Sequence, residues 1–336
     1  MFKTLVVGGT GFLGGAIVDS IARAGHEVTV LSRGGTKRDL PDGTRTLHGD
    51  RYGSLVALRN EQFDFVFDTC AFSPDAVENL LDAIGLGFRR YVLVSSISAY
   101  GTFLKPLLNE SDAVPTANEA DVEVARNVPE RNRGNAAAYG ASYGPLKRAC
   151  EILAHDRLGE KAISLRVGLL AGAGDYTDRL TWWVRRIDQG GMVVAPAPHS
   201  RPIQLIDARD AAKFAVHAAV SELSGIYNVT GPEMPLCAVL NEAIRISESG
   251  AELVWVSEQK LKDAEIEAWS EMPLMAPPVP SFRYLMQVDT GKAHAAGLTT
   301  RPPTDTLEQV LRWDRLNRER PLKCGVSPEK ERAALS

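Results

Sequence analysis

Short apolar runs and helix-like blocks alternate along the first half of the chain. The apolar runs predict buried strands, and they are Thr4 to Val7, HEVTVLSR, FDFVFDTCAF, RRYVLVSS and KAISLRVGLL. Between them, apolar residues recur at helical spacing from Phe12 to Ala24, and Ser73-Pro74 is a typical helix start. Strands separated by helices predict right-handed βαβ units, and therefore an α/β fold with a doubly wound parallel sheet.

The second half of the chain has a less regular pattern. Pro-rich loops such as VAPAPHSRP and EMPLMAPPVP alternate with two helix-like blocks, ARDAAKFAVHAAV and LCAVLNEAIRIS. This change predicts a first domain over about 1–170, to which a segment near about 200–230 returns, and a smaller mixed α/β C-terminal domain over about 171–320. The charged residues 321–336 are expected to form a flexible tail.

Composition narrows the classes of protein that this chain can be. The net charge of -4 and the pI near 5.9 argue against a general nucleic-acid binder. No apolar run reaches about 18 residues, so no membrane-spanning helix is expected. The start of the chain lacks the layout of a signal peptide, which favours a cytoplasmic location. The four cysteines lie far apart in sequence, which predicts reduced thiols and no metal site.

A glycine-rich turn follows the first predicted strand. Gly8, Gly11 and Gly14 form a GxxGxxG pattern between that strand and the first predicted helix. In Rossmann-type folds such glycines permit a tight turn, close approach of a pyrophosphate to the backbone, and close packing of helix on strand. The pattern therefore predicts a dinucleotide site with its phosphates at the helix N-terminus, although a glycine-rich turn without a ligand has the same sequence.

The end of the second predicted strand bears on which dinucleotide binds. A carboxylate there would bind the ribose hydroxyls of NAD, but this chain has Ser32 and Arg33, with Lys37 and Arg38 close behind. A hydroxyl and a guanidinium suit a 2′-phosphate, so NADP is favoured over NAD; solvated loop cations are the alternative. Asp50, after the expected third strand, could accept from the adenine amino group or could only cap a helix.

A tyrosine and a lysine suggest acid–base chemistry. Tyr143 and Lys147 are four residues apart in YGPLKRACE, on one face of a predicted helix. A phenol with a pKa near ~10 is a poor acid or base at neutral pH, and a neighbouring ammonium favours the phenolate. Such a tyrosine can exchange a proton with a substrate while hydride moves to or from a nicotinamide. The same spacing occurs on solvated helices, and Tyr100 and Tyr139 lie nearby.

The predicted strand in VLVSSISAYG ends in two serines, Ser95 and Ser96, and a third serine, Ser98, follows it. They would lie at the carboxyl edge of the sheet, where ligands of α/β proteins bind. Ser96 is expected to hydrogen-bond the reacting oxygen, Ser98 is its competitor, and Ser95 is expected to be structural. Each could instead only cap the end of the strand.

These segments together resemble the extended short-chain dehydrogenase/reductase family, also called the NAD-dependent epimerase/dehydratase family. In chain order the matching segments are GGTGFLG, HGD, DTCA, SSISAYG, YGPLKRACE, SRPIQLIDARDAA and VDTGKAHAAGLTTRPPTDTLEQVL. The resemblance implies a catalytic triad of Ser96, Tyr143 and Lys147, and a homodimer formed through two helices that include the Tyr–Lys helix. The cofactor contacts expected are Gly8, Thr10, Gly11, Phe12, Leu13, Gly14, Ser32, Arg33, Arg38, Asp50, Ala71, Tyr143, Lys147 and Gly168.

The chain also departs from parts of that family. Ile97 and Ser98 stand where dehydratases carry an Asp-Glu pair, so elimination of water is not expected. Arg201 and Arg283 lie where sugar-nucleotide members place arginines for a diphosphate, so a nucleotide-sugar substrate stays open. The long segment 101–139 is a candidate substrate lid.

The stretch YTDRLTWWVRRI could border the substrate. Tyr176 and Arg179 are candidates to line the pocket, and Trp182 and Trp183 suit either the pocket or the core. The expected substrate contacts are thus Ser98, Tyr176, Arg201 and Arg283.

We therefore expect an enzyme, an NADP-dependent oxidoreductase with NAD as the alternative coenzyme. Hydride would pass between nicotinamide C4 and a carbinol or carbonyl carbon of a polar small molecule held by the C-terminal domain, with Tyr143 as acid–base. One alternative is an epimerase of a sugar or nucleotide sugar that works through a transient keto intermediate. Another is a non-catalytic relative that binds a dinucleotide or RNA, although neither a nucleic acid nor a membrane is expected as a partner.

Overall fold

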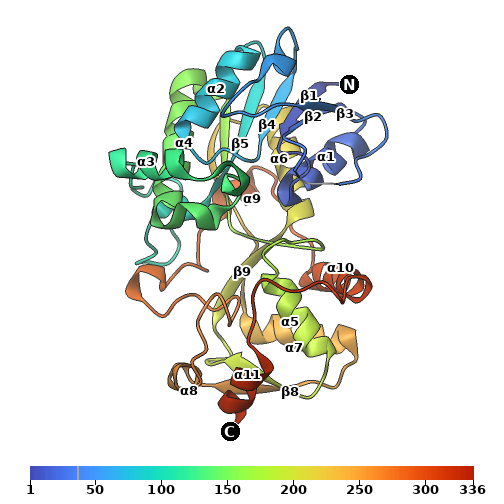
Figure 1. Cartoon of the computed structure of the whole chain (residues 1–336), viewed down its shortest axis with the longest axis vertical. Helices are drawn as coiled ribbons and strands as arrows, with labels where there is room; N and C mark the ends of the chain where they lie inside the picture. Colours follow the sequence, from blue (N-terminus) through green and yellow to red (C-terminus); the bar gives the residue numbers. More distant parts are fainter. Residues whose placement is uncertain (36–37) are drawn as a thin grey trace.

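The computed structural model describes residues 1–35 and 38–336 and shows two lobes stacked along the long axis (Figure 1). The N-terminus lies in the lobe drawn at the top, and the C-terminus lies at the far end of the other lobe. The upper lobe is built on a seven-stranded sheet, and the lower lobe contains sheets of three and two strands. The predicted mixed α/β class with a doubly wound parallel sheet is confirmed.

The large sheet has the spatial order β10-β6-β5-β4-β1-β2-β3, and all its neighbouring strands are parallel. Its strands are β1 (Lys3–Val7), β2 (Glu27–Ser32), β3 (Arg45–His48), β4 (Phe65–Asp68), β5 (Arg90–Ser96), β6 (Ala162–Val167) and β10 (Gly225–Val229). The chain builds outward from β1 in one direction and then from β4 in the other. A crevice therefore opens at the carboxyl ends of β1 and β4, where Val7 pairs with Asp68.

Two helices cover each face of this sheet. They are α1 (Phe12–Arg23) and α6 (Ala208–Val220) on one face, and α2 (Pro74–Ile84) and α4 (Tyr143–Leu158) on the other. Alternate residues of a strand point to opposite faces, so Val6 packs in the α1–α6 cluster while Leu5 and Val7 pack in the α2–α4 cluster. Pro74 takes the first position of α2 as expected, whereas the Ser73 side chain makes no capping hydrogen bond.

The lower lobe surrounds a second hydrophobic core. Its strands are β7 (Leu169–Ala171), β8 (Met192–Pro196), β9 (Pro202–Asp207), β11 (Glu233–Pro235) and β12 (Glu252–Val256). Its main helices, α5 (Arg179–Asp188), α7 (Leu236–Ser247) and α10 (Pro303–Leu316), pack against one another. Gly168 alone separates β6 from β7, and a Cβ there would lie 2.4 Å from the Thr230 Oγ1, so this close crossing between the sheets requires glycine.

Several later segments return to the upper lobe. Besides α6 and β10, α9 (Gly291–Ala295) packs against β10, and Ala293 and Leu298 join the upper core. The remaining helices are α3 (Glu119–Asn127), α8 (Glu258–Asp263) and α11 (Pro328–Leu335), and the short 3₁₀ turns are Val56–Leu58, Ile97–Tyr100, Glu130–Asn132, Ala136–Ser142, Gly159–Lys161 and Pro280–Phe282. Within the described ranges, no helix is both long and apolar enough to cross a membrane.

The C-terminal residues 321–336 are packed, which corrects the expectation of a flexible tail. Helix α11 buries Ala334 completely against the lower core. Glu331 accepts from the Arg186 Nε at 2.8 Å and from the Val194 amide at 3.2 Å. The charged composition misled the prediction because two of these charges, Lys330 and Glu331, are paired with Glu271 and Arg186 of the lower lobe.

Candidate functional site

One large cavity follows the carboxyl edge of the seven-stranded sheet and continues to the lower lobe. It has a volume of about 1420 Å³, and its wall includes the ends of β1, β2, β4, β5 and β6. This volume exceeds the range of roughly 300–1,000 Å³ of pockets for single small ligands, so the cavity has room for a dinucleotide and a substrate together.

The glycine turn forms the floor of the cavity at its middle. Gly8 has a φ of +81°, and a Cβ there would lie 2.6 Å from the Thr69 Oγ1. A Cβ on Gly14 would lie only 2.2 Å from the Gly8 oxygen, so only glycine permits this approach of helix to strand. Gly11 is the N-cap of α1 and brings no side-chain hydrogen bond, which leaves the first amides of the helix free for an anion. The residues present thus fit a pyrophosphate.

Ser32 and Arg33 line the cavity at its β2–β3 end, as Asp50 does from the loop after β3. The Arg33 Nη1 donates to the Glu130 carbonyl at 2.8 Å. The Asp50 Oδ1 accepts from the Tyr52 amide at 3.0 Å, so this carboxylate stabilises the local turn of residues 50–52. Asp50 also lines the cavity.

Arg38 lies away from the cavity, against the expectation that it contacts the cofactor. Its Nη2 pairs with the Asp19 Oδ2 of α1 at 2.6 Å. Its guanidinium also lies across Gly15, where an added Cβ would come within 2.4 Å of the Arg38 Cζ. Lys37 lies outside the described residues.

Tyr143 is the first residue of α4, and its side chain borders the cavity at the β5–β6 end. Burial raises the pKa of this phenol above its usual value of 10.0, while a hydrogen bond with Ser96 and the charge of Arg179 act in the opposite direction. Two groups that favour the phenolate therefore come from the end of β5 and the start of α5.

Lys147 lies one turn along α4, below Tyr143. Its Nζ donates to the Ala71 carbonyl at 2.7 Å and to the Val94 carbonyl at 2.6 Å, and burial lowers its pKa from the usual 10.5. Ala71, expected to contact the cofactor, does not line the cavity; its carbonyl is the acceptor for Lys147. The two carbonyls hold the ammonium at the bottom of the cavity, between β4 and β5.

The structure separates the three serines at the end of β5. The Ser95 hydroxyl donates to the Glu151 Oε1 at 2.6 Å and is part of the interior. The Ser96 hydroxyl accepts from the Ser98 amide at 3.1 Å and lies beside Tyr143. Ser98 also lines the cavity, so Ser96 and Ser98 both stay candidates.

The far end of the cavity is formed by the lower lobe. Tyr176 lines it and is 48% exposed, and Arg179 extends over the Trp269 ring at 4.6 Å from the ring centroid. Trp182 and Trp183 belong to the lower core instead, with the Trp183 Nε1 donating to the Pro273 carbonyl at 2.7 Å.

Two expected substrate contacts lie outside the cavity. Arg201 pairs with the Glu258 Oε1 of α8 at 2.7 Å and donates to the Ala197 carbonyl at 2.8 Å. Arg283 is exposed and extends over the Tyr284 ring. Neither guanidinium lines the cavity, so the residues expected to hold a diphosphate are not brought together.

The other expected cofactor contacts are brought together at the cavity. Its lining includes Thr10, Phe12, Leu13 and Gly168. Sequence reasoning did not identify Asp175 or Trp269, which line the far end of the cavity from two loops. No motif marks them, because their positions depend on how the lower lobe packs.

Segment 101–139 is divided between two parts of the molecule. Its first part reaches the lower lobe, where the Phe103 amide donates to the Ser281 carbonyl at 2.7 Å and Leu108 bridges to Val288. Its last part, from Pro129 onward, lies instead at the β2–β3 end of the cavity, beside Arg33. Gly101 and Phe103 also line the cavity, so a substrate lid stays a prediction for the first part of the segment.

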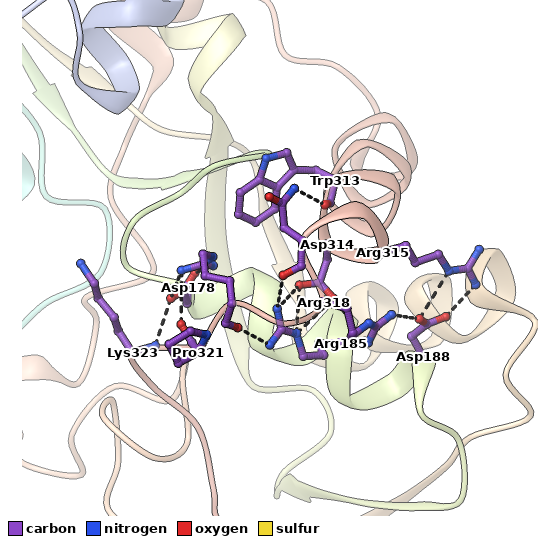
Figure 2. Close-up of polar contacts among 11 residues, drawn as sticks. Asp178, Arg185, Asp188, Trp313, Asp314, Arg315, Arg318, Pro321 and Lys323 are labelled. Atoms are coloured by element: carbon purple, nitrogen blue, oxygen red, sulfur yellow. Dashed lines mark hydrogen bonds and ion pairs between the residues drawn. The ribbon is translucent and has the colours of Figure 1, made fainter. Parts of the chain in front are cut away.

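Residues 320–336, which we call the C-terminal arm, support the loop that carries Tyr176. Figure 2 shows Asp178 beside Pro321 and Lys323. Asp178 is fully buried, pairs with Arg320, and accepts from the Lys323 amide at 3.0 Å. The Lys323 Nζ lies 5.6 Å from the centroid of the Tyr176 ring. The arm thus fixes one wall of the cavity from outside.

A second group of ion pairs joins α5 to α10 and to Arg318 just after it. Figure 2 shows Asp188 between two arginines, and Arg185 against Asp314. The Arg185 Nη2 pairs with the Asp314 Oδ1 at 2.7 Å, and Asp188 pairs with Arg315 and Arg318. These contacts hold α5, the helix that begins at Arg179, against α10.

Comparisons with known proteins agree with this architecture. Residues 4–230 match the model of the NAD dependent epimerase/dehydratase family. The chain is 35% identical over 127 residues to a 2′-dehydrokanamycin reductase of Streptomyces kanamyceticus, covering 36% of this chain and 35% of that protein. It is 26% identical over 247 residues to the chloroplast stem-loop binding protein of 41 kDa b of Arabidopsis thaliana, covering 68% of this chain and 58% of that protein.

The chain therefore spans between about a third and three-fifths of the length of these curated relatives. Among solved structures, a UDP-glucuronic acid 4-epimerase from Bacillus cereus in complex with NAD is similar, with a TM-score of 0.65 and 14% identity. That likeness covers 94% of this chain and 99% of the other, and it shows a shared fold.

Proposed function

The chain belongs to the NAD-dependent epimerase/dehydratase family, and from this premise we propose that it is an NADP-dependent oxidoreductase. It interconverts a carbonyl and a carbinol group on a polar small molecule. The observation that carries the proposal is the position of Tyr143, which borders the same cavity as the glycine turn and lies beside Ser96.

The chain's own residues account for the proton in this reaction. When bound, the nicotinamide coenzyme supplies the hydride for reduction of the carbonyl carbon or accepts it in the reverse direction. In reduction, the Tyr143 hydroxyl donates its proton to the carbonyl oxygen, and the Ser96 hydroxyl orients that oxygen. The carbonyl gains one hydride and one proton and becomes an alcohol. Tyr143 is left as a phenolate, which Ser96 and Arg179 stabilise until water reprotonates it.

Lys147 has a supporting role in this proposal. Its ammonium is held by two backbone carbonyls at the bottom of the cavity, one turn from Tyr143 on α4. A third N–H of the ammonium stays available for a ribose hydroxyl of the coenzyme. Lys147 thus positions the coenzyme relative to the phenol.

The coenzyme is proposed to be NADP rather than NAD. Ser32 and Arg33 line the cavity at the end of β2, where an NAD-binding chain of this fold would place a carboxylate. Arg33 has no ion-pair partner among the residues that the structure describes, so its charge is available to a 2′-phosphate.

The substrate is proposed to be small and to carry several polar groups. The far end of the cavity combines the aromatic side chains of Tyr176 and Trp269 with the charged groups of Asp175 and Arg179. Both arginines expected to hold a diphosphate lie elsewhere, which favours a substrate without a nucleotide. The Streptomyces relative is named as a reductase of 2′-dehydrokanamycin, and its name fits the direction of reaction proposed here.

An epimerase is the second candidate, because the same tyrosine could take the proton of a carbinol and return it after the keto intermediate has turned its other face to the hydride. The two differ in coenzyme use. We would incubate the purified protein with NADPH and a panel of polar ketones, and separately with NADP+ and the corresponding alcohols, and follow NADPH absorbance and products. Stoichiometric loss of NADPH supports a reductase. Conversion of an alcohol to its epimer with no net change in NADPH supports an epimerase. The absence of any product together with the absence of NADPH binding would reject both.

The resemblance to a stem-loop binding protein makes RNA binding a third outcome to exclude. The net charge of -4 does not favour it.

We also propose a homodimer through the exposed faces of α2 and α4, which light scattering at several protein concentrations would test.

A further inference from the structure

Residues 129–141, between α3 and α4, lie across the β2–β3 end of the cavity. We call them the 129–141 segment. The part of it that lines the cavity consists of Pro129, Glu130, Arg131, Arg133, Gly134, Ala136, Gly140 and Ala141. In Figure 1 the green coils between α3 and α4 lie at the lower edge of the upper lobe. The segment runs from the β2–β3 end of the cavity to Tyr143, the first residue of α4.

The 129–141 segment is attached at the ends of three strands. At the end of β2, the Arg33 Nη1 donates to the Glu130 carbonyl at 2.8 Å. After β3, the Arg133 guanidinium lies over the Tyr52 ring, 4.5 Å from its centroid. After β4, the Tyr139 ring stacks on Phe72 with 5.2 Å between centroids. These attachments hold the segment over the place where the fold puts the adenosine half of a dinucleotide.

The segment adds positive charge at this place. Arg131 and Arg133 line the cavity together with Arg33. None of the three has a carboxylate partner within the described residues, whereas Arg126, just before the segment, pairs with Asp75 at 3.7 Å. The acidic groups that face the same space are Asp50 and Glu130. Three guanidiniums therefore face two carboxylates, and the surplus charge is positive.

We propose that the 129–141 segment covers the adenosine end of the coenzyme, and that Arg131 and Arg133 complete with Arg33 a three-guanidinium site for the 2′-phosphate. This inference rests on the proposed function. It extends that proposal by assigning coenzyme specificity to a segment about 100 residues away in sequence from the strand end that normally determines it.

The physical basis is the difference between a phosphate and a hydroxyl. A 2′-phosphate carries close to two negative charges and three acceptor oxygens, and guanidiniums bind such groups in a planar two-point geometry. The 2′-hydroxyl of NAD offers no charge to them. Removing one guanidinium should therefore weaken binding of the 2′-phosphorylated compound and leave the other compound almost unchanged.

The test uses two probes that differ only in the 2′-phosphate. Calorimetric titration would measure the binding of 2′,5′-ADP and 5′-AMP to the full chain and to Arg131→Ala, Arg133→Ala and the control Arg126→Ala. We expect each of the first two variants to lose about tenfold or more in affinity for 2′,5′-ADP, with 5′-AMP changing less than about threefold. The control should match the unmodified protein for both probes.

Arg133→Ala also removes the stacking of the guanidinium on the Tyr52 ring, so a further variant separates the effect of the lost charge from the effect of the lost stacking. Arg133→Lys keeps the charge but loses the planar stacking, and we expect it to recover part of the affinity for 2′,5′-ADP. Hydrogen exchange of residues 129–141 gives an independent measure, which should slow with 2′,5′-ADP and not with 5′-AMP. Equal losses for both probes, or no loss for either, would overturn the inference.

The two proposals fail in different ways. If the unmodified protein binds neither NADPH nor NADH, the proposed function fails and this inference fails with it. If the unmodified protein prefers NADPH and both arginine variants keep that preference undiminished, only the role assigned to the 129–141 segment fails.

Discussion

Glu151 of α4 and Arg166 of β6 form a two-point ion pair in the interior of the upper lobe. The Arg166 Nε donates to Oε1 at 2.9 Å and its Nη2 to Oε2 at 2.8 Å, and both side chains are at most 1% exposed. The Ser95 hydroxyl donates to the same carboxylate. These contacts hold α4, the helix that carries Tyr143, against β5 and β6, whose ends border the cavity. They therefore help to fix the position of the phenol, although they do not touch it.

We expect Glu151→Ala to destabilise the protein by about 3–5 kcal/mol, because Arg166 would be left buried without a partner. Urea denaturation would measure this change. Glu160→Ala, at an exposed position just after α4, is the control and should change stability by less than about 0.5 kcal/mol. Two variants of equal stability would show that the pair does not hold the helix.

The same pair should make the protein sensitive to acid. Burial by itself would raise the pKa of Glu151, but hydrogen bonds from Arg166 and Ser95 hold it below the usual 4.5. Because the folded pKa is the lower one, the carboxylate stabilises the fold above the unfolded pKa. This contribution is lost as the pH falls through the folded pKa. Unfolding measured at about pH 7 and about pH 4 should show a smaller acid loss for Glu151→Gln than for the unmodified protein.

Tyr143→Phe should lower turnover by about 10²–10⁴-fold, because the proton donor is removed while the ring remains. Binding of NADPH, followed by fluorescence titration, should change less than about twofold. Tyr227→Phe, a buried tyrosine of β10 that does not line the cavity, serves as the matched control. Full activity in Tyr143→Phe would reject the proposed chemistry.

The pH dependence of the two directions of reaction should differ. Burial raises the pKa of Tyr143 above 10.0, so the phenol stays protonated at neutral pH. Reduction should therefore be nearly constant around neutrality and fall only in alkali, whereas oxidation should rise with pH. Removing the charge in Arg179→Met should move the alkaline limb to higher pH, and a shift to lower pH would contradict the assigned effect of that guanidinium.

Gly14→Ala should weaken NADPH binding by about tenfold or more, or ~1.4 kcal/mol. The added Cβ would lie 2.2 Å from the Gly8 oxygen, so the turn that receives the pyrophosphate must open. Gly87→Ala is the control, because a Cβ there meets no atom within 4 Å. Equal affinities in a calorimetric titration would show that the pyrophosphate does not bind at this turn.

Local sequence was sufficient for the parts of the site that lie on regular elements of the upper lobe. The glycine turn, the serines at the end of β5 and the Tyr143–Lys147 spacing each depend on one strand or helix and its immediate neighbours. A period of two or of 3.6 residues decides which side chains such an element presents, so the order of strands and helices could be predicted.

Long-range packing decided the rest. Arg201 and Arg38 have the chemistry of ligand-binding residues, but Glu258 and Asp19 lie within reach of them and neutralise them. The C-terminal arm looks solvated by composition, yet its charges find partners in the lower lobe.

The sequence by itself thus determined the sheet, the glycine turn and the helix that carries the proposed acid–base pair, because their patterns are local. Only the tertiary structure decided which of the candidate cations have a carboxylate partner, and that the 129–141 segment lies at the β2–β3 end of the cavity. An arginine's role depends on whether a carboxylate from elsewhere in the chain comes within about 4 Å of it, and no local pattern records that distance.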